Sequence, residues 1–174
     1  MTTIYANVGI VGNGAMGRGI AQIAAQAKST VRLYDTQAGV AVKARESICA
    51  QWDKLLEKGR LSADDVQAYK DRLLVAETLD DLAACDLIVE AVIERLDIKK
   101  SLFAQLEALL PETAVLASNT SSLSVTAIAA GLKHPERVVG YHFFNPVPLM
   151  KVVEVIAGIK TSLSVCAVIS AFVK

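Results

Sequence analysis

The sequence lacks the features that mark membrane proteins and nucleic-acid-binding proteins. No uninterrupted apolar run approaches the roughly 18 residues that a membrane-spanning helix needs. The formal net charge is zero, from 18 basic and 18 acidic residues without a long basic stripe, so nothing favours binding to nucleic acid or to a membrane surface. The remaining properties, 174 residues of which 53% are hydrophobic, predict one soluble domain with a large core.

Cysteine is also scarce. Cys49, Cys85 and Cys166 lie far apart and form no C-x-x-C pair, so the sequence favours neither a disulfide framework nor a zinc site, and we expect no metal. We expect these three side chains to be small buried hydrophobes. The first predicted strand begins within a few residues of Met1, which leaves no room for a signal peptide, and the expected location is the cytoplasm.

A glycine-rich turn near the start of the chain is the most informative motif. Residues 4–11 have the continuous hydrophobicity of a buried strand, and residues 20–25 continue with helical spacing. Between them, Gly12, Gly14 and Gly17 form G-x-G-x-x-G. In a dinucleotide-binding turn these glycines permit the tight turn, the approach of the pyrophosphate and close helix packing, in that order. Alone, such a cluster is often only a tight turn.

Asp35 strengthens the dinucleotide interpretation. It ends the second apolar run, residues 31–34, and follows Gly17 by 18 residues, near the spacing expected for the acid that binds the adenosine ribose. The alternative for Asp35 is a helix N-cap. A carboxylate here would repel the extra phosphate of NADP, so NAD is the expected cofactor, although Arg32 near the strand end could accept that phosphate.

Two helices are predicted after Asp35 in place of a single crossover helix. Residues 37–58 have few helix breakers, Gly59 ends the first helix, and Ser62 caps a second helix that runs to Arg72. This helical hairpin carries basic side chains that are candidates for an anionic ligand, or that form a solvated charged face. They are Lys43, Lys54, Lys58 and Arg60.

The second half continues the alternation of strands and helices. Strands are predicted at residues 73–75, 86–92 and 114–117, and helices at residues 79–85 and 96–110. The polar residues 118–122 follow the last of these strands, where open α/β sheets place their ligands. The alternative is a loop in which Ser122 or Ser124 caps a helix that extends to Gly131, and both interpretations can hold at once.

Two further β-rich runs, residues 138–144 and 151–156, flank a turn centred near residue 148. If they pair, His142 and Glu154 fall opposite each other, because each lies six residues from that centre. This placement predicts either a functional His–Glu pair or a structural histidine beside a solvent-facing glutamate. His134 is predicted to lie in a loop without such a partner.

Four segments together resemble the amino-terminal domain of the 3-hydroxyacyl-CoA dehydrogenase family, in particular the bacterial 3-hydroxybutyryl-CoA type, over essentially the whole chain. They are GNGAMGRGIA (12–21), EAVIE (90–94) with Lys99 and Lys100, SNTSSL (118–123) and HFFNPVPLMKVVE (142–154). The expected fold is α/β, a Rossmann-like doubly wound and mainly parallel sheet with a helical hairpin insertion and a terminal antiparallel strand pair.

The resemblance implies NAD-dependent oxidation of a 3-hydroxyacyl-CoA to a 3-ketoacyl-CoA, a β-oxidation-type step of fatty acid metabolism. It implies that His142 is the general base, that Glu154 orients its imidazole, that Ser121 bonds the reacting oxygen, and that Ser121 and Asn145 contact the substrate. The hairpin is similar to the arm that helps to cover CoA. The implied cofactor-binding residues are Gly12, Asn13, Gly14, Ala15, Met16, Gly17, Asp35, Glu94, Lys99 and Asn119.

Relatives continue into a helical domain that closes the substrate cleft and makes most of a homodimer contact. Residues 161–174 are therefore expected to begin a connection to such a domain, and the chain alone is expected to have little or no activity. We expect an exposed apolar patch on the last helix, formed by Val165, Val168, Ile169 and Phe172. Two alternatives stay open: another NAD-dependent β-hydroxyacid dehydrogenase, against which residues 142–146 argue, and a non-catalytic NAD-binding or structural relative.

Overall fold

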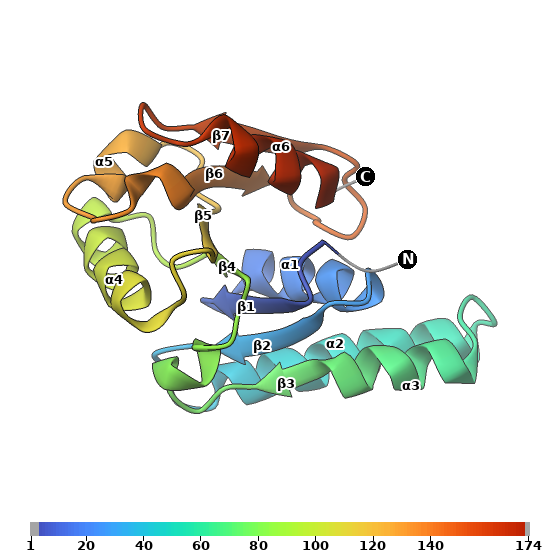
Figure 1. Ribbon diagram of the computed structural model, residues 1–174. Helices are drawn as coiled ribbons and strands as arrows, with labels where there is room; N and C mark the ends of the chain where they lie inside the picture. Colours follow the sequence, from blue (N-terminus) through green and yellow to red (C-terminus); the bar gives the residue numbers. More distant parts are fainter. Residues whose placement is uncertain (1–3, 173–174) are drawn as a thin grey trace.

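The computed structural model describes residues 4–172 and contains a seven-stranded sheet in the order β3-β2-β1-β4-β5-β6-β7 (Figure 1). All neighbouring strands run parallel except β6 and β7, which are antiparallel. This architecture confirms the predicted fold class. The strands are β1 (Asn7–Val11), β2 (Thr30–Tyr34), β3 (Leu73–Val75), β4 (Leu87–Glu90), β5 (Val115–Ser118), β6 (Val138–Phe143) and β7 (Val153–Ala157).

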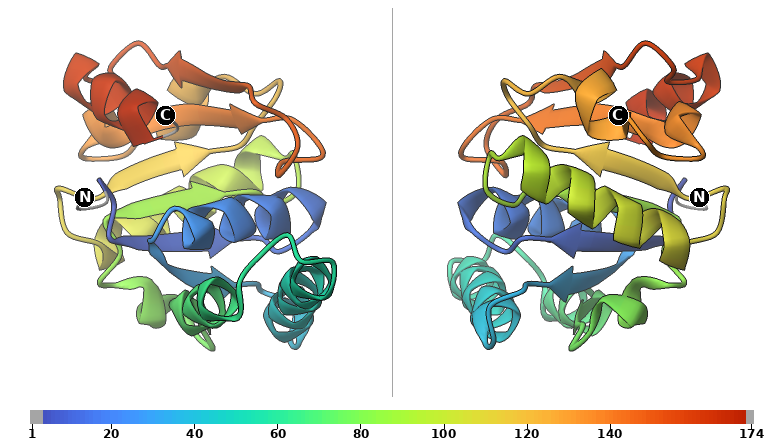
Figure 2. Two further views of the ribbon diagram at one scale, coloured as in Figure 1. Left: turned by 90° about the vertical axis from the view of Figure 1, so that its right-hand side faces the viewer. Right: turned by 90° about the vertical axis from the view of Figure 1, so that its left-hand side faces the viewer.

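Helices cover both faces of the sheet (Figure 2). One face packs against α1, α2 and α6, and the other against α4 and α5. The helices are α1 (Ala15–Gln26), α2 (Val40–Glu57), α3 (Ala63–Arg72), α4 (Leu96–Leu109), α5 (Val125–Ala129) and α6 (Leu163–Phe172), with 3₁₀ turns η1 (Leu79–Leu82) and η2 (Pro135–Arg137). Because both faces are covered, β4 and β5 are buried along their whole length.

The strand order reverses between β1 and β4, which is a topological switch point. β2 and β3 lie on one side of β1, whereas the chain returns to add β4, β5 and β6 on the other side. The carboxyl ends of these parallel strands all reach the same edge of the sheet. The loops after β1, β2, β4, β5 and β6 therefore meet at that edge.

The helical hairpin is present as predicted, with α2 beside α3 (Figure 1). Gly59 adopts a positive φ of 65° after α2, and the Ser62 hydroxyl caps α3 by accepting from the backbone N–H of Asp65. Trp52 packs on Tyr69 across the hairpin, with ring centroids 5.5 Å apart. The basic candidates on α2 and the following turn are exposed.

Several predicted boundaries were too wide. The helix expected at residues 37–58 begins at Val40, because Gly39 precedes it with a left-handed φ of 78°. The helix expected at residues 79–85 is only the 3₁₀ turn η1, which Thr78 and Asp81 close with a capping box. Ser124, rather than Ser122, caps α5, which ends at Ala129.

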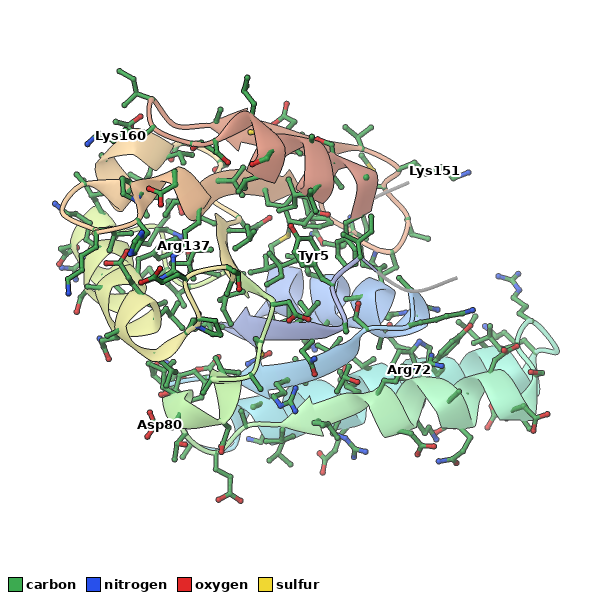
Figure 3. All side chains as sticks on the ribbon, viewed as in Figure 1. Tyr5, Arg72, Asp80, Arg137, Lys151 and Lys160 are labelled. Carbon is green, nitrogen blue, oxygen red and sulfur yellow. The ribbon has the colours of Figure 1, made fainter. Side chains whose placement is uncertain are left out.

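The expected exposed patch on the last helix was wrong in part. α6 packs on the same face of the sheet as α1, and Ile169 is fully buried there. Phe172 contacts the ring of Tyr5 edge to face, with centroids 5.2 Å apart, and Figure 3 shows Tyr5 beneath α6. Only Val168 of the large residues in the predicted patch is exposed.

The three cysteines are free, but only Cys85 is fully buried. Burial raises the pKa of the Cys85 thiol to about 11. Cys49 and Cys166 are half-buried, so the expectation of three buried thiols was correct for one. Over residues 4–172, the helices are too short or too polar to cross a membrane, and no group of three or more His, Cys, Asp or Glu side chains is arranged to hold a metal ion.

Two residues near the start of β6 depart from the sequence-based picture. Arg137, labelled in Figure 3, is buried and donates to the backbone carbonyls of Pro111, Ala114 and Glu107 near the end of α4. No role is predicted for Arg137 from the sequence. His134 does have a carboxylate partner, because its Nδ1 lies 3.1 Å from Glu136 Oε1.

Candidate functional site

The glycine turn between β1 and α1 is closed at two positions and open at the third. A Cβ at Gly12 would lie 2.7 Å from the carbonyl oxygen of Ala91, and Gly12 has a φ of 90°. A Cβ at Gly17 would lie 1.9 Å from the carbonyl oxygen of Gly12. A Cβ at Gly14 would meet no atom within 4 Å. The turn therefore leaves space at Gly14, in front of the N-terminus of α1.

Asp35 lies against this turn. Its Oδ2 accepts a hydrogen bond from the backbone N–H of Asn13 at 2.8 Å, and its Oδ1 accepts from the N–H of Gln37 at 3.0 Å. The side chain of Asn13 also donates to the carbonyl of Tyr34 at 2.6 Å. Gly39, and not Asp35, is the N-cap of α2, so the alternative role as a helix cap does not apply.

A groove of about 770 Å³ runs from the glycine turn past Asp35 to α4. It is lined by Val11, Gly12, Asn13, Gly14, Tyr34, Asp35, Thr36, Gln37, Val40, Leu79, Ala91, Val92, Ile93, Asp97, Ile98, Ser101, Leu102 and Gln105. This lining contains two carboxylates and neither lysine nor arginine. Arg32 instead donates to Asn7 Oδ1 at the start of β1, so it does not provide a phosphate partner in the groove.

Glu94 holds the polar loop after β5. Its Oε1 accepts from the Thr120 hydroxyl and from the backbone N–H groups of Ser121 at 3.2 Å and Ser122 at 3.4 Å. Burial opposes ionisation of this carboxyl, but the Thr120 hydrogen bond and the charge of Lys99 outweigh it and lower the pKa to about 2. Glu94 is therefore ionised at neutral pH, and Ser121 is exposed beside it.

Beneath Glu94 lies a fully buried ion pair. Lys99 Nζ is 2.6 Å from Glu90 Oε1 and 3.2 Å from Glu94 Oε2, and the Ser118 hydroxyl donates to Glu90 Oε2 at 2.7 Å. The sequence-based prediction included Glu94 and Lys99 but missed Glu90, Ser118 and Thr120. A signal for Glu90 was present, because a charged residue ends the otherwise apolar run of β4.

Asn119 joins the ends of β5 and β6. Its side-chain oxygen accepts from the backbone N–H of Phe143 at 2.9 Å, and its own N–H donates to the carbonyl of Glu90. These bonds place the loop that carries Ser121 next to the strand that carries His142.

His142 and Glu154 form the predicted pair. They are opposite each other in the antiparallel register of β6 and β7, and His142 Nδ1 lies 2.8 Å from Glu154 Oε2. Because an ionised carboxylate only accepts hydrogen bonds, this contact places a proton on Nδ1. Among residues 4–172, Nε2 has no hydrogen-bond partner, so this nitrogen is available as a proton acceptor.

The loop from Asn145 to Met150 follows the histidine strand. The Asn145–Pro146 bond is cis, and Asn145 is exposed. Val147 packs against α1 so closely that a Cβ at Gly19 would lie 2.7 Å from the Val147 Cβ. At the start of α1, Ala15 is exposed and Met16 is half-buried. The structure thus brings the predicted site residues from the first and last thirds of the chain to one edge.

The chain matches a known protein family and several curated proteins. The family described as "3-hydroxyacyl-CoA dehydrogenase, NAD binding domain" matches residues 7–174. The 3-hydroxyadipyl-CoA dehydrogenase of Escherichia coli (strain K12) is 46% identical over 158 residues, which is 91% of this chain and 33% of that protein. A probable 3-hydroxybutyryl-CoA dehydrogenase of Bacillus subtilis (strain 168) is 41% identical over 153 residues, 88% of this chain and 53% of that protein.

Solved structures give the same result. The crystal structure of 3-hydroxybutyryl-CoA dehydrogenase from Escherichia coli K12 matches with a TM-score of 0.95 and 43% identity, covering 97% of this chain and 36% of that one. The (S)-3-hydroxybutyryl-CoA dehydrogenase from Ralstonia eutropha matches with a TM-score of 0.92 and 37% identity, covering 97% and 60%. The chain spans only a third to about half of the length of the two curated relatives described above.

Proposed function

Because this chain belongs to the 3-hydroxyacyl-CoA dehydrogenase family and spans its NAD-binding domain, we propose that it supplies the cofactor half of an enzyme that oxidises 3-hydroxyacyl-CoA to 3-ketoacyl-CoA. The observation that carries this proposal is the His142–Glu154 pair, whose Nε2 has no partner in the described structure. The pair lies at the same sheet edge as the glycine turn and Asp35.

The residues at this edge fit NAD. Gly14 leaves room for a pyrophosphate at the N-terminus of α1, where backbone N–H groups and the helix dipole favour negative charge. Asp35 would offer a carboxylate to the adenosine ribose, and Glu94 and Asn119 would lie toward the nicotinamide half, with Lys99 buried behind Glu94. Bound NAD⁺ supplies the acceptor for the hydride that leaves the substrate carbon.

His142 acts as the general base. Its free Nε2 takes the proton of the 3-hydroxyl group while the hydride leaves, because Nδ1 is held by Glu154 and Nε2 has no partner in the described structure. The Glu154 carboxylate accepts from Nδ1–H, which fixes the tautomer and stabilises the imidazolium that forms. Ser121 bonds the reacting oxygen, and Asn145 contacts the acyl group.

The substrate half of the site belongs to the wider protein. In this proposal, the exposed basic residues of the α2–α3 hairpin contact the CoA phosphates, and residues 161–174 lead into a helical domain that completes the cleft and forms a homodimer. The protein acts in the cytoplasm in a β-oxidation-type step. We call this domain together with the additional segment found in its relatives the complete enzyme.

The test compares two substrates. The complete enzyme is expected to form NADH from 3-hydroxybutyryl-CoA with a kcat/KM far above that for free 3-hydroxybutyrate. A preference for the free acid would favour another β-hydroxyacid dehydrogenase. Saturable NAD binding without turnover of either compound would identify a non-catalytic relative and contradict the proposal.

Replacing Asp35 with alanine is expected to narrow the preference for NAD over NADP. The wild-type carboxylate accepts hydrogen bonds from the ribose hydroxyls and repels a 2′-phosphate. The groove lining contains neither lysine nor arginine that would attract this phosphate. Calorimetric titration of the 174-residue chain with both cofactors measures the ratio of the two Kd values. Asp64→Ala, an exposed acid in the first turn of α3, is the control. Equal affinities of the wild-type chain for NAD and NADP would contradict the assignment of Asp35 as the residue that selects NAD.

A further inference from the structure

Glu90, Lys99 and Glu94 form a continuous chain of charges from the core to the cofactor edge. The side chains of Glu90 and Lys99 are 0% and 1% exposed, whereas that of Glu94 is 37% exposed. The single ammonium group lies between two carboxylates, at 2.6 Å and 3.2 Å. Two carboxylates and one ammonium group give the cluster a formal net charge of one negative unit.

Every contact of the Glu90 carboxylate comes from a donor. Oε1 accepts from Lys99 and from the backbone N–H of Val92 at 2.7 Å, and Oε2 accepts from the Ser118 hydroxyl. These bonds connect the end of β4, the first turn of α4 and the end of β5. This set of donors fixes the position of the buried Glu90 carboxylate, and with it the positions of the Lys99 ammonium and the Ser118 hydroxyl.

Glu94 connects the buried Lys99 to the loop after β5 at the surface. Its Oε2 faces Lys99, and its Oε1 holds the loop of Thr120, Ser121 and Ser122. Asp35 lies on the opposite side of the glycine turn, at the end of β2. A dinucleotide whose ribose bound Asp35 and whose phosphates lay at the turn would extend its nicotinamide half over β4 and β5.

We propose that Glu90 is a positioning residue that fixes Lys99 and Glu94 and gives the cluster its net negative charge, and that this charge favours binding of NAD⁺ relative to NADH. The physical reason is that the nicotinamide ring is positive in NAD⁺ and neutral in NADH, while the phosphates are the same in both. This inference rests on the proposed function, because it assigns the oxidised cofactor as the form that meets the substrate.

The test is calorimetric titration of the 174-residue chain with NAD⁺ and with NADH. In Glu90→Gln the cluster becomes neutral, and the ratio Kd(NAD⁺)/Kd(NADH) is expected to rise by about threefold to tenfold, which is the effect of one unit charge at about 12–25 Å with an effective dielectric constant near 20. If Glu90 had a purely structural role, its replacement would raise the Kd of NAD⁺ and the Kd of NADH by the same factor. An unchanged ratio therefore contradicts the proposal.

Two further variants make the test independent of folding defects. Glu90→Gln with Lys99→Met restores one net negative charge, so the ratio is expected to return toward the wild-type value. If Glu90→Gln does not fold, Glu94→Gln makes the same change of net charge at a partly exposed position and must also raise the ratio. A folded Glu94→Gln variant with the wild-type ratio overturns the proposal.

Asp53→Asn provides the matched control. It also removes one negative charge from an ion pair, with Lys70 at 2.6 Å, but in the α2–α3 hairpin. Its ratio is expected to stay at the wild-type value, and a rise equal to that of Glu90→Gln would contradict a local effect. Because these titrations need no substrate, their result is separate from the outcome of the turnover test.

Discussion

Replacing His142 with alanine is expected to lower the kcat of the complete enzyme by about a hundred- to ten-thousand-fold, the usual contribution of a positioned general base. KM for the acyl-CoA is expected to change much less, because the base acts mainly in the transition state. Steady-state kinetics with 3-hydroxybutyryl-CoA and NAD⁺ measures both constants. A kcat near the wild-type value for His142→Ala would overturn the assignment of the site.

Two other variants define the specificity of this effect. Glu154→Gln keeps a hydrogen-bonding group beside Nδ1 but loses the charge that stabilises the imidazolium, so a smaller decrease of kcat is expected. His134→Ala is the matched control, because His134 also lies beside carboxylates but precedes β6 at the opposite edge of the sheet. Its kcat is expected to stay at the wild-type value.

Replacing Gly17 with alanine is expected to destabilise the domain by at least about 2 kcal/mol and to abolish measurable NAD binding. The added Cβ would lie 1.9 Å from the carbonyl oxygen of Gly12, so α1 and the turn must move apart. Denaturant unfolding followed by the fluorescence of Trp52, the only tryptophan and fully buried, measures the free energy of unfolding. An unchanged free energy of unfolding would contradict the close approach of Gly17 to the carbonyl oxygen of Gly12.

Gly14→Ala separates binding from stability. Its added Cβ meets no protein atom within 4 Å, so the free energy of unfolding is expected to stay within about 0.5 kcal/mol of the wild type. The methyl group occupies the space in front of α1, so NAD affinity is expected to fall about tenfold or more. Unchanged affinity in Gly14→Ala would contradict the placement of the pyrophosphate at this turn.

Local sequence patterns were sufficient to predict much of the fold. Apolar strands alternating with helices predicted the parallel sheet, and the symmetry of two β-rich runs about residue 148 predicted that His142 faces Glu154. This second prediction succeeded because antiparallel register follows directly from the position of the turn. Asp35 could be placed beside the glycine turn because β1 and β2 are neighbouring parallel strands.

The remaining features depend on contacts between distant segments. The bond from Ser118 to Glu90 joins residues 28 positions apart, and no local pattern predicts it. Likewise, Arg137 is buried because it reaches the carbonyls at the end of α4. The burial of Ile169 depends on the return of α6 to the sheet face that α1 covers, which its apolar sequence alone does not determine.

In the proposed function, this domain supplies the cofactor half of an enzyme that transfers hydride from the C3 atom of an acyl-CoA to NAD⁺. The most direct measurement supplies the complete enzyme with 3-hydroxybutyryl-CoA deuterated at C3 and determines the mass of the reduced cofactor. The account predicts NADH that carries one deuterium, formed together with the 3-ketoacyl-CoA and nearly absent in His142→Ala. Formation of the ketone with unlabelled NADH, or no reduction of NAD⁺ at all, would contradict it.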